Sequence, residues 1–341
     1  MVNYTAPWWL PGGNLQTIWA ARVAQRFAGA APAFRRERWA TPDHDFIDVD
    51  FSDTAAPMPV TACTTLFPVS VALQPLLVVF HGLEGSSQSH YCQALAAVAA
   101  KRGWACCVPH FRGCSGELNS GPRAYHSGDF EELDWVLHRL QAEHTGPLLA
   151  VGISLGGNAL MRWAGELGSR AAQVVRAVAS VSSPLDLAAG GWAIGRGFNR
   201  HVYTRMFLRS MVPKALQKLD QHPGLFSRSA MLAVRDIYAF DNIFTAPLHG
   251  FKNTDDYYQR ASAKPYLQSV AVPALALNAL NDPFIPAWSL PTAAQAGSCV
   301  TLWQPAQGGH VGFPESVPPF GYPAHVRAMP DAVTAFLGAH L

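Results

Sequence analysis

The chain has 341 residues, of which 49% are hydrophobic and only 14% are charged, so it can bury a large core and does not belong to the intrinsically disordered class. Its 25 basic and 23 acidic residues give a formal net charge of +2 without a run of Lys or Arg, which argues against a nucleic-acid partner. The 13 histidines show no metal-ligand spacing, so we expect no metal and no other cofactor.

The cysteines, the N-terminal residues and the uncharged stretches indicate the cellular location of the protein. The six cysteines are too sparse and irregular for a disulfide framework, and we expect reduced, mostly buried thiols at Cys63, Cys92, Cys106, Cys107, Cys114 and Cys299. The N-terminal residues lack a basic region followed by an apolar one, so no secretory signal is evident. Residues 54–83 and 283–314 carry no charge, but prolines interrupt both stretches. We therefore expect a soluble, cytoplasmic protein without stable membrane insertion.

The predicted elements alternate between strands and helices. Residues 38–40 and 46–51 alternate around a short polar turn, which predicts an antiparallel hairpin at a sheet edge. Apolar runs then predict strands, and helical spacing of apolar residues predicts helices between them. In chain order these are strand 75–80, helix 87–102, strand 104–109, helix 129–144, strand 147–153, a helix from Leu155, strands 174–181, 273–279 and 300–303, and helix 324–341. This order is typical of an α/β fold with a mostly parallel sheet flanked by helices.

The alternation stops between residues 186 and 264. This segment is rich in Arg, Phe, Met and Tyr, contains several helix-like pieces and lacks a convincing buried strand. We interpret 186–264 as a helical cap insertion, and 1–185 with 265–341 as the core. The cap aromatics could line an acyl pocket or simply pack onto the core: Trp192, Phe198, Tyr203 and Phe207.

A G-x-S-x-G pattern supplies the candidate nucleophile. Gly152-Ile153-Ser154-Leu155-Gly156-Gly157 follows a predicted strand and opens a predicted helix. Such a turn lifts the serine hydroxyl clear of the sheet, and its strained backbone needs small neighbours. The alternative is a glycine-rich turn with a buried, unreactive serine. The flanking elements favour Ser154 as the nucleophile.

A serine nucleophile needs a base, and the base needs an orienting acid, in the chain order Ser, Asp or Glu, His. His310 follows the last predicted strand in a glycine-rich loop and is the candidate base, whereas we expect His249 and His325 on the surface. Asp282 follows strand 273–279, at the end of a strand where catalytic groups gather, and is the candidate acid. Its rival is Asp186.

Two backbone amides are expected to form the oxyanion hole. The Leu155 N–H lies at a helix N-terminus directly after the nucleophile, and the Leu83 N–H follows Gly82 in the loop after strand 75–80. We expect His81 in the same loop to be structural. No chemistry is needed to explain the acidic helix start at residues 127–132.

Several segments resemble the α/β-hydrolase superfamily and, more narrowly, its YheT-like branch of hydrolases. The resemblance runs from the N-terminus to His310, with a departure at Cys114, and rests on residues 7–10, 14–17, 81–86, 110–116, 126–129 and 255–258. It implies the α/β-hydrolase fold with a cap. It also implies a triad of Ser154, Asp282 and His310, with oxyanion donors at Leu83 and Leu155. The members resemble carboxylic ester hydrolases, and some eukaryotic relatives act on phospholipid acyl chains.

The expected function is hydrolysis of carboxylic esters with short- to medium-chain acyl groups, through an acyl-enzyme on Ser154. The substrate is then a small-molecule ester, possibly lipid-like. Amidase, thioesterase or peptidase activity would use the same triad, with Asp255 and Asp256 as an acidic subsite for a peptidase. A non-catalytic ligand-binding member of the fold is the remaining alternative. Trp8 and Trp9 either contact a membrane or, as we expect, lie buried against the cap.

Overall fold

The computed structural model describes residues 4–52, 73–316 and 325–341. Of the six cysteines, Cys63 lies outside these ranges. The other five are free thiols, buried at Cys92, Cys106, Cys107 and Cys114 and half-buried at Cys299, as expected for these five. Burial raises the pKa of Cys106 to about 12, so this thiol stays protonated and unreactive at neutral pH.

Within the described ranges, eight strands form one sheet in the order β1-β2-β4-β3-β5-β6-β7-β8. Their bounds are β1 Phe34–Ala40, β2 Phe46–Ser52, β3 Leu76–Phe80, β4 Ala105–Pro109, β5 Leu148–Ile153, β6 Ala177–Val181, β7 Ala274–Leu277 and β8 Val300–Trp303. The expected hairpin of β1 and β2 is antiparallel, and β2 also pairs with β4 in the antiparallel direction. The other six strands, β3 to β8, run parallel to one another. The carboxyl ends of β3, β5, β6, β7 and β8 therefore open at one edge of the sheet.

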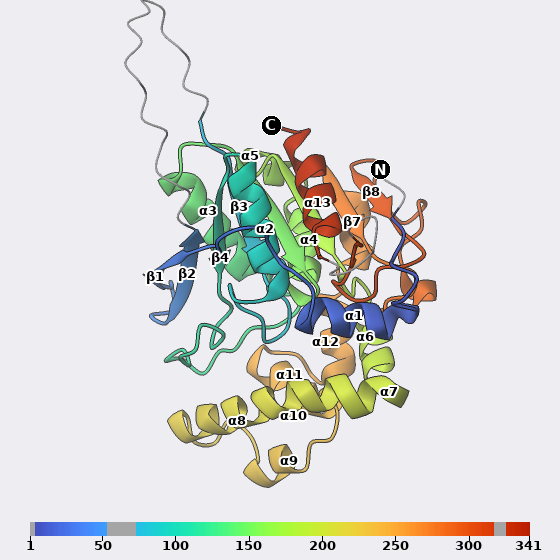
Figure 1. Ribbon diagram of the computed structural model, residues 1–341. Coiled ribbons are helices and arrows are strands. Elements are labelled where there is room, and N and C mark those ends of the chain that lie inside the picture. The colour runs from blue at the N-terminus through green and yellow to red at the C-terminus, as the bar shows by residue number, and fades with distance from the viewer. Residues whose placement is uncertain (1–3, 53–72, 317–324) are drawn as a thin grey trace, which may run out of the picture.

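Helices cover both faces of the sheet (Figure 1). Leu76, Val78 and Phe80 of β3 pack in the core with α3 (Phe130–Glu143) and α4 (Leu155–Leu167). The alternate residues Leu77 and Val79 pack with α2 (His90–Lys101) and α13 (Ala328–Gly338). Both faces of the strand are buried, which is why its sequence is continuously apolar instead of alternating.

Three differences from the expected elements stand out. Helix α1 (Gly12–Arg22) was not expected; it has no side-chain N-cap, and its buried residues, Gln16, Thr17 and Ala20, show little hydrophobic pattern. β6 begins late because η1 (Gly168–Arg170) and α5 (Ala171–Val174) occupy the preceding residues. The last helix is shorter than the range 324–341.

The expectation that Trp8 is buried against the cap is wrong. Its side chain is 91% exposed instead of buried against the cap. Trp9 packs edge-on against Trp19 of α1, with ring centroids 5.2 Å apart. The Trp8 ring, in contrast, lies in solvent.

A set of helices separates β6 from β7. It comprises α6 Leu187–Ile194, α7 Gly197–Asn199, the π-helical turn η2 Arg200–Thr204, α8 Arg205–Gln221, α9 Arg228–Leu232, α10 Ile237–Ile243, α11 Thr245–Leu248, α12 Thr254–Ala261 and η3 Lys264–Ser269. Most of these helices lie together beyond the strand ends, at the bottom of Figure 1. They contain a hydrophobic cluster of their own around Met211, Met231 and Phe240. A short turn, η4 (Ala287–Ser289), follows β7.

No helix in the described ranges combines the length and the apolar character that crossing a bilayer requires.

Arg112, in the loop after β4, forms ion pairs with α3 and with the β1-β2 turn. Its guanidinium donates to Glu132 of α3 at 2.6 Å and to Asp43 and Asp45 of the β1-β2 turn at 2.7 and 3.1 Å. The Arg112 side chain is only 2% exposed, and those of Asp45 and Glu132 are 1% and 5% exposed. This loop continues into residues that line the pocket described below, so the pocket wall depends on a buried ionic cluster.

We expect Arg112→Ala to lower the free energy of unfolding by about 3–5 kcal/mol, because the substitution leaves buried carboxylates without a counter-charge. Urea denaturation of the two proteins measures the difference. Arg228→Ala removes an exposed ion pair with Asp220 and should change stability by less than about 1 kcal/mol. Equal effects of the two substitutions would show that the Arg112 cluster contributes no more than a surface pair.

Candidate active site

Ser154 sits at the sharp turn between β5 and α4. Its φ is +52°, in the left-handed region that a serine rarely adopts, and its N–H donates to the Val181 carbonyl of β6 at 2.8 Å. Two neighbours must be glycine, because a Cβ at Gly152 would overlap the Gly156 carbonyl and one at Gly157 would overlap Ser183 Oγ. The local sequence thus permits a turn that projects the serine hydroxyl beyond the strand end.

His310 reaches Ser154 from the loop after β8. Its Nε2 lies 3.1 Å from Ser154 Oγ. The loop is held by α1: the His310 N–H donates to Thr17 Oγ1 at 2.8 Å, and the Gly308 N–H donates to Gln16 Oε1 at 2.9 Å. The helix that the sequence did not reveal therefore fixes the position of the histidine.

Asp282 completes the hydrogen-bonded line. Its carboxylate follows β7, is fully buried, and accepts from His310 Nδ1 at 2.9 Å through Oδ2. The Phe284 N–H donates to the other oxygen at 2.8 Å, and the Phe284 ring packs against the imidazole with centroids 4.2 Å apart. With Nδ1 protonated, Nε2 is free to accept the Ser154 hydroxyl proton.

The rival residues lie elsewhere. Asp186 accepts from the Ala189 N–H and caps α6. The expectation of a surface position is wrong for His325, which is buried, whereas His249 is half-buried. The His249 ring bonds the Thr245 and Ala124 carbonyls. His325 is 7% exposed, because its backbone bridges to Gln25 and Glu315.

The two amides expected to receive an oxyanion flank Ser154. Leu155 is the first residue of α4, where an N–H has no intrahelical acceptor. In the other loop, a Cβ on Gly82 would come within 3.2 Å of Ser154 Cβ, so the chain before Leu83 passes close to the nucleophile. His81 is structural, as expected: Nδ1 donates to the Gly82 carbonyl at 2.8 Å and Nε2 accepts from the Phe111 N–H at 3.0 Å. Burial lowers the pKa of His81 to about 3, which keeps this ring neutral.

A pocket of about 170 Å³ opens beside Ser154 and His310. Its walls are mostly apolar and come from the core and from the helices between β6 and β7, with Leu83, Ile194, Phe207, Met211, Phe240 and Phe284 among them. Of the four aromatics that could have formed an acyl pocket, only Phe207 lines it. Trp192 and Phe198 are about half exposed, and Tyr203 packs edge-on against Phe284.

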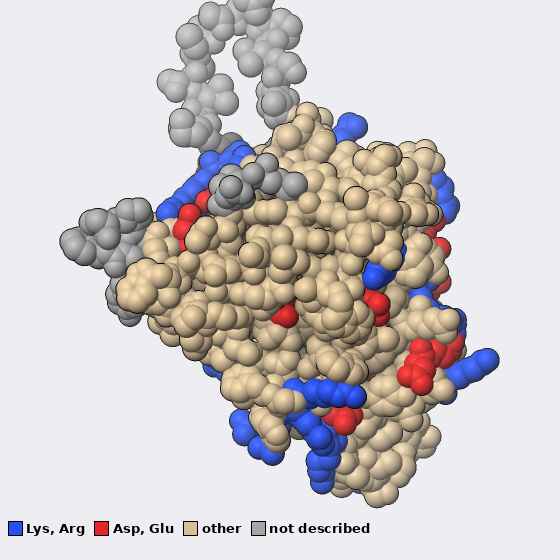
Figure 2. All heavy atoms as spheres, turned by 90° about the vertical axis from the view of Figure 1, so that its right-hand side faces the viewer, with Lys and Arg blue, Asp and Glu red and all other residues tan. Residues whose placement is uncertain are grey.

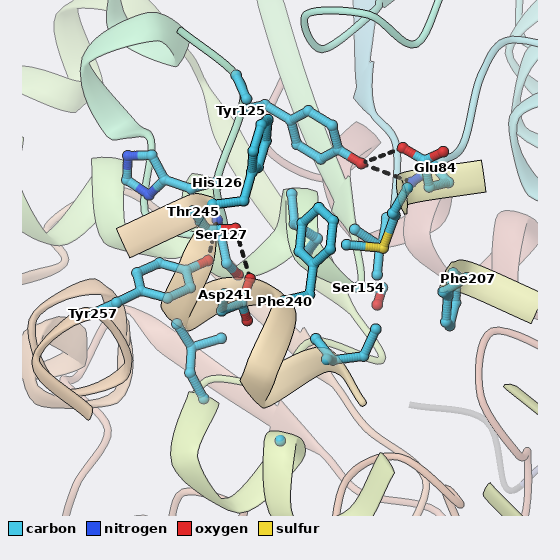
Figure 3. Close-up of a pocket in the computed structure, with 18 of the residues that line it drawn as sticks. Glu84, Tyr125, His126, Ser127, Ser154, Phe207, Phe240, Asp241, Thr245 and Tyr257 are labelled. Atoms are coloured by element: carbon cyan, nitrogen blue, oxygen red, sulfur yellow. Dashed lines mark hydrogen bonds between the residues drawn. The ribbon is translucent and has the colours of Figure 1, made fainter. Parts of the chain in front are cut away.

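The loop that carries Leu83 is also bonded to α8. Glu84 has a positive φ of 56°, accepts from Tyr125 OH at 3.0 Å and pairs with Lys214 Nζ at 2.9 Å. Tyr125 lies beside Glu84 in Figure 3, on one side of the pocket. This contact could not be predicted from the sequence, because a single Glu and a single Lys 130 positions apart form no pattern.

The opposite side of the pocket is polar. In Figure 3, Asp241, Thr245, Ser127 and Tyr257 gather on the side away from Glu84, with Phe240 between them and Ser154. Asp241 accepts from Thr245 Oγ1 at 2.6 Å and from Tyr258 OH at 2.9 Å. Burial raises the pKa of Asp241 to about 6, against the hydrogen bonds from Thr245 and Tyr258 that lower it.

Asp241 makes stability depend on pH in a defined window. Between pH about 4 and 6 the folded protein keeps a proton that the unfolded chain has lost, so this group's contribution to stability falls as pH rises. We expect the free energy of unfolding of wild type, minus that of Asp241→Asn, to decrease by up to about 1.4 kcal/mol per pH unit there. Denaturation at a series of pH values measures the slope. A difference between wild type and Asp241→Asn that stays flat between pH 4 and 6 would contradict the pKa shift of Asp241.

The acids considered for a peptidase subsite do not line the pocket. Asp255 is exposed and accepts from Tyr238 OH at 3.0 Å. Asp256 accepts from the Lys252 N–H and from Arg260, in the first turn of α12. Within the described ranges, no group of three or more His, Cys, Asp or Glu is arranged to hold a metal ion.

Comparisons with known proteins identify the family and the fold of the chain. Residues 75–317 match the family described as alpha/beta hydrolase fold. The Escherichia coli (strain K12) protein named "Putative esterase YheT" is 39% identical over 303 residues, which cover 88% of this chain and 84% of that protein. The Mus musculus protein named "Phospholipase ABHD3" is 29% identical over 295 residues, covering 84% and 68%. The solved structure of the Pyrococcus furiosus esterase Pf2001 aligns with a TM-score of 0.53 at 13% identity, over 93% of this chain and 97% of its own. The fold expected from the sequence is confirmed.

Proposed function

Because this chain belongs to the α/β-hydrolase superfamily, and within it resembles the YheT-like branch, we propose that it is a serine esterase. Its triad would consist of Ser154, His310 and Asp282. The observation that carries the proposal is the unbroken line of hydrogen bonds from Asp282 to His310 and on to Ser154, at 2.9 and 3.1 Å, beside an apolar pocket. These distances are within reach for a nucleophile, its base and the orienting acid.

The proposed reaction is acyl transfer. His310 Nε2 takes the Ser154 proton as Oγ attacks the ester carbonyl carbon, and the buried Asp282 carboxylate stabilises the imidazolium that results. His310 then returns the proton to the leaving alcohol. A water molecule, deprotonated by His310, attacks the acyl-enzyme and releases the carboxylic acid and free Ser154.

The Leu83 and Leu155 N–H groups are the proposed oxyanion donors. The helix start at Leu155 and the close approach of Gly82 to Ser154 support this assignment. The ion pair of Glu84 with Lys214 would then restrain the Leu83 loop from α8. In this proposal residues 1–185 and 265–341 form the core, and residues 186–264 act as a cap that closes the pocket.

The proposed substrate is a carboxylic ester with a short- to medium-chain acyl group. The small, mostly apolar pocket supports it, and the name of the mouse relative supports a lipid-like ester. An acidic peptidase subsite is less well supported, since Asp255 and Asp256 lie outside the pocket lining. The buried free thiols support a cytoplasmic location as part of the same proposal.

We expect Ser154→Ala to lower kcat for p-nitrophenyl esters by about 10⁴-fold or more, because the acyl-enzyme can no longer form. Asp282→Asn should retain the fold and also lose about 10⁴-fold, since the histidine tautomer would be wrong. Hydrolysis of esters with two to twelve acyl carbons measures both effects, and turnover should fall once the chain outgrows the pocket.

The matched control is Ser229→Ala, which removes an exposed hydroxyl on α9 and should hydrolyse these esters as wild type does. A fluorophosphonate should label wild type and the control but not Ser154→Ala. Absence of turnover on every ester, together with absence of labelling, would overturn the proposal and favour a ligand-binding protein.

A further inference from the structure

One exposed face of the helices between α6 and α8 combines large apolar side chains with arginines. Trp192, Phe198, Val202 and Met206 are 53, 52, 37 and 43% exposed. The last three are spaced by four residues along consecutive helical turns, so they lie on one side of that stretch. We call this surface, together with the arginines named next, the basic aromatic face.

The arginines of this face are free of acidic partners. Arg196, Arg200, Arg205 and Arg209 are all exposed, and none of them forms an ion pair within the described part of the chain. Residues 192–235 contain eight Lys and Arg against a single acid, Asp220. Figure 2 shows blue side chains gathered at the end of the molecule that these helices form. Positive charge is therefore concentrated on this part of the surface, although the net charge of the whole chain is only +2.

The segments that contact Tyr203 of η2 carry exposed apolar side chains as well. Tyr203, behind Phe198, donates its OH to Asn14 of α1 at 3.0 Å and belongs to a buried cluster with Phe284 and Leu290. The exposed side chains next to this cluster in sequence are Leu15, at 48%, and Trp288 of η4, at 70%. Scattered exposed apolar residues are ordinary, but an extended group of them among unpaired arginines indicates a binding surface.

Helix α8 lies between this face and the pocket. Phe207, Met211 and Lys218 of α8 line the pocket beside Ser154, whereas Met206 and Arg209 point into solvent. The width of a single helix, about 10 Å, thus separates the exposed surface from the space where we propose that esters bind.

We propose that the basic aromatic face docks the protein onto a membrane surface that contains anionic phospholipids. Aromatic and aliphatic side chains enter the boundary between headgroups and acyl chains, and the arginines bind lipid phosphates. Arg196 already lies over the Trp192 ring at 4.4 Å, an arrangement that brings cation and ring to one depth. Docking would place the pocket beside a source of lipid esters; that consequence rests on the proposed function, whereas docking itself does not.

Co-sedimentation of the full chain with lipid vesicles tests the proposal. All proteins carry Ser154→Ala, so that any hydrolysis leaves the vesicles intact. Vesicles consist of phosphatidylcholine alone, or of two parts phosphatidylcholine to one part phosphatidylglycerol. We expect at least tenfold stronger partitioning onto the anionic vesicles, weakened by added salt.

Matched variants separate the charged and apolar contributions. Arg205→Glu with Arg209→Glu should weaken partitioning onto anionic vesicles by at least tenfold, since each basic residue near such a surface contributes about fivefold. Trp192→Ser with Phe198→Ser should weaken partitioning onto both vesicle types. The controls change exposed residues that precede the amino ends of β6 and β3, at the other end of the strands from the helices of this face: Arg170→Glu with Arg176→Glu, and Leu73→Ser. They should bind as the parent does.

Failure of the docking proposal is distinguishable from failure of the esterase proposal. With Ser154 restored, the surface variants should hydrolyse a soluble p-nitrophenyl ester at the wild-type rate. Normal hydrolysis with no vesicle binding, or equal binding by controls and surface variants, would overturn docking. So would a concentration-dependent dimer that Phe198→Ser abolishes without any vesicle binding, because the face would then bind a second copy of the chain.

Discussion

The site depends first on the close packing of backbone at the β5-α4 turn. Ser154 adopts a left-handed conformation that costs a serine about 1–3 kcal/mol, and this strain persists only because the surroundings hold it. Its N–H is bonded to Val181 of the adjacent strand, and side chains at Gly152 or Gly157 would collide with neighbouring atoms. β5 lies between β3 and β6 in the sheet, and on the β3 side a Cβ at Gly156 would overlap the Phe80 carbonyl.

The other two members of the hydrogen-bonded line are positioned by contacts between distant parts of the chain. Asp282 and His310 follow adjacent parallel strands, so the sheet brings them to the same edge as Ser154. The histidine loop is then fixed by Thr17 and Gln16, almost 300 residues earlier in the sequence. Helix α1 therefore acts as a support for the loop, although it contributes no side chain to the pocket lining.

Helix α8 links the remaining features. One side of it lines the pocket and bonds the core, through Lys214 to Glu84 and through Lys218 to the carbonyls of Asn119 and Gly121. The other side is exposed and basic. A displacement of this helix would change the pocket wall, the restraint on the Leu83 loop and the exposed surface together, because all three are parts of one rigid element.

The sequence by itself determined the strand order along the chain, the glycine-rich turn, and the identity of the three residues that the structure brings within hydrogen-bonding distance. These rest on local signals: apolar runs, the steric need for glycine, and positions at strand ends. Only the tertiary structure decided the support of His310 by α1, the buried Arg112 cluster, the raised pKa of Asp241 and the exposure of Trp8. Each of these depends on which residues meet across tens or hundreds of positions, and single polar residues at such separations leave no periodic pattern to read.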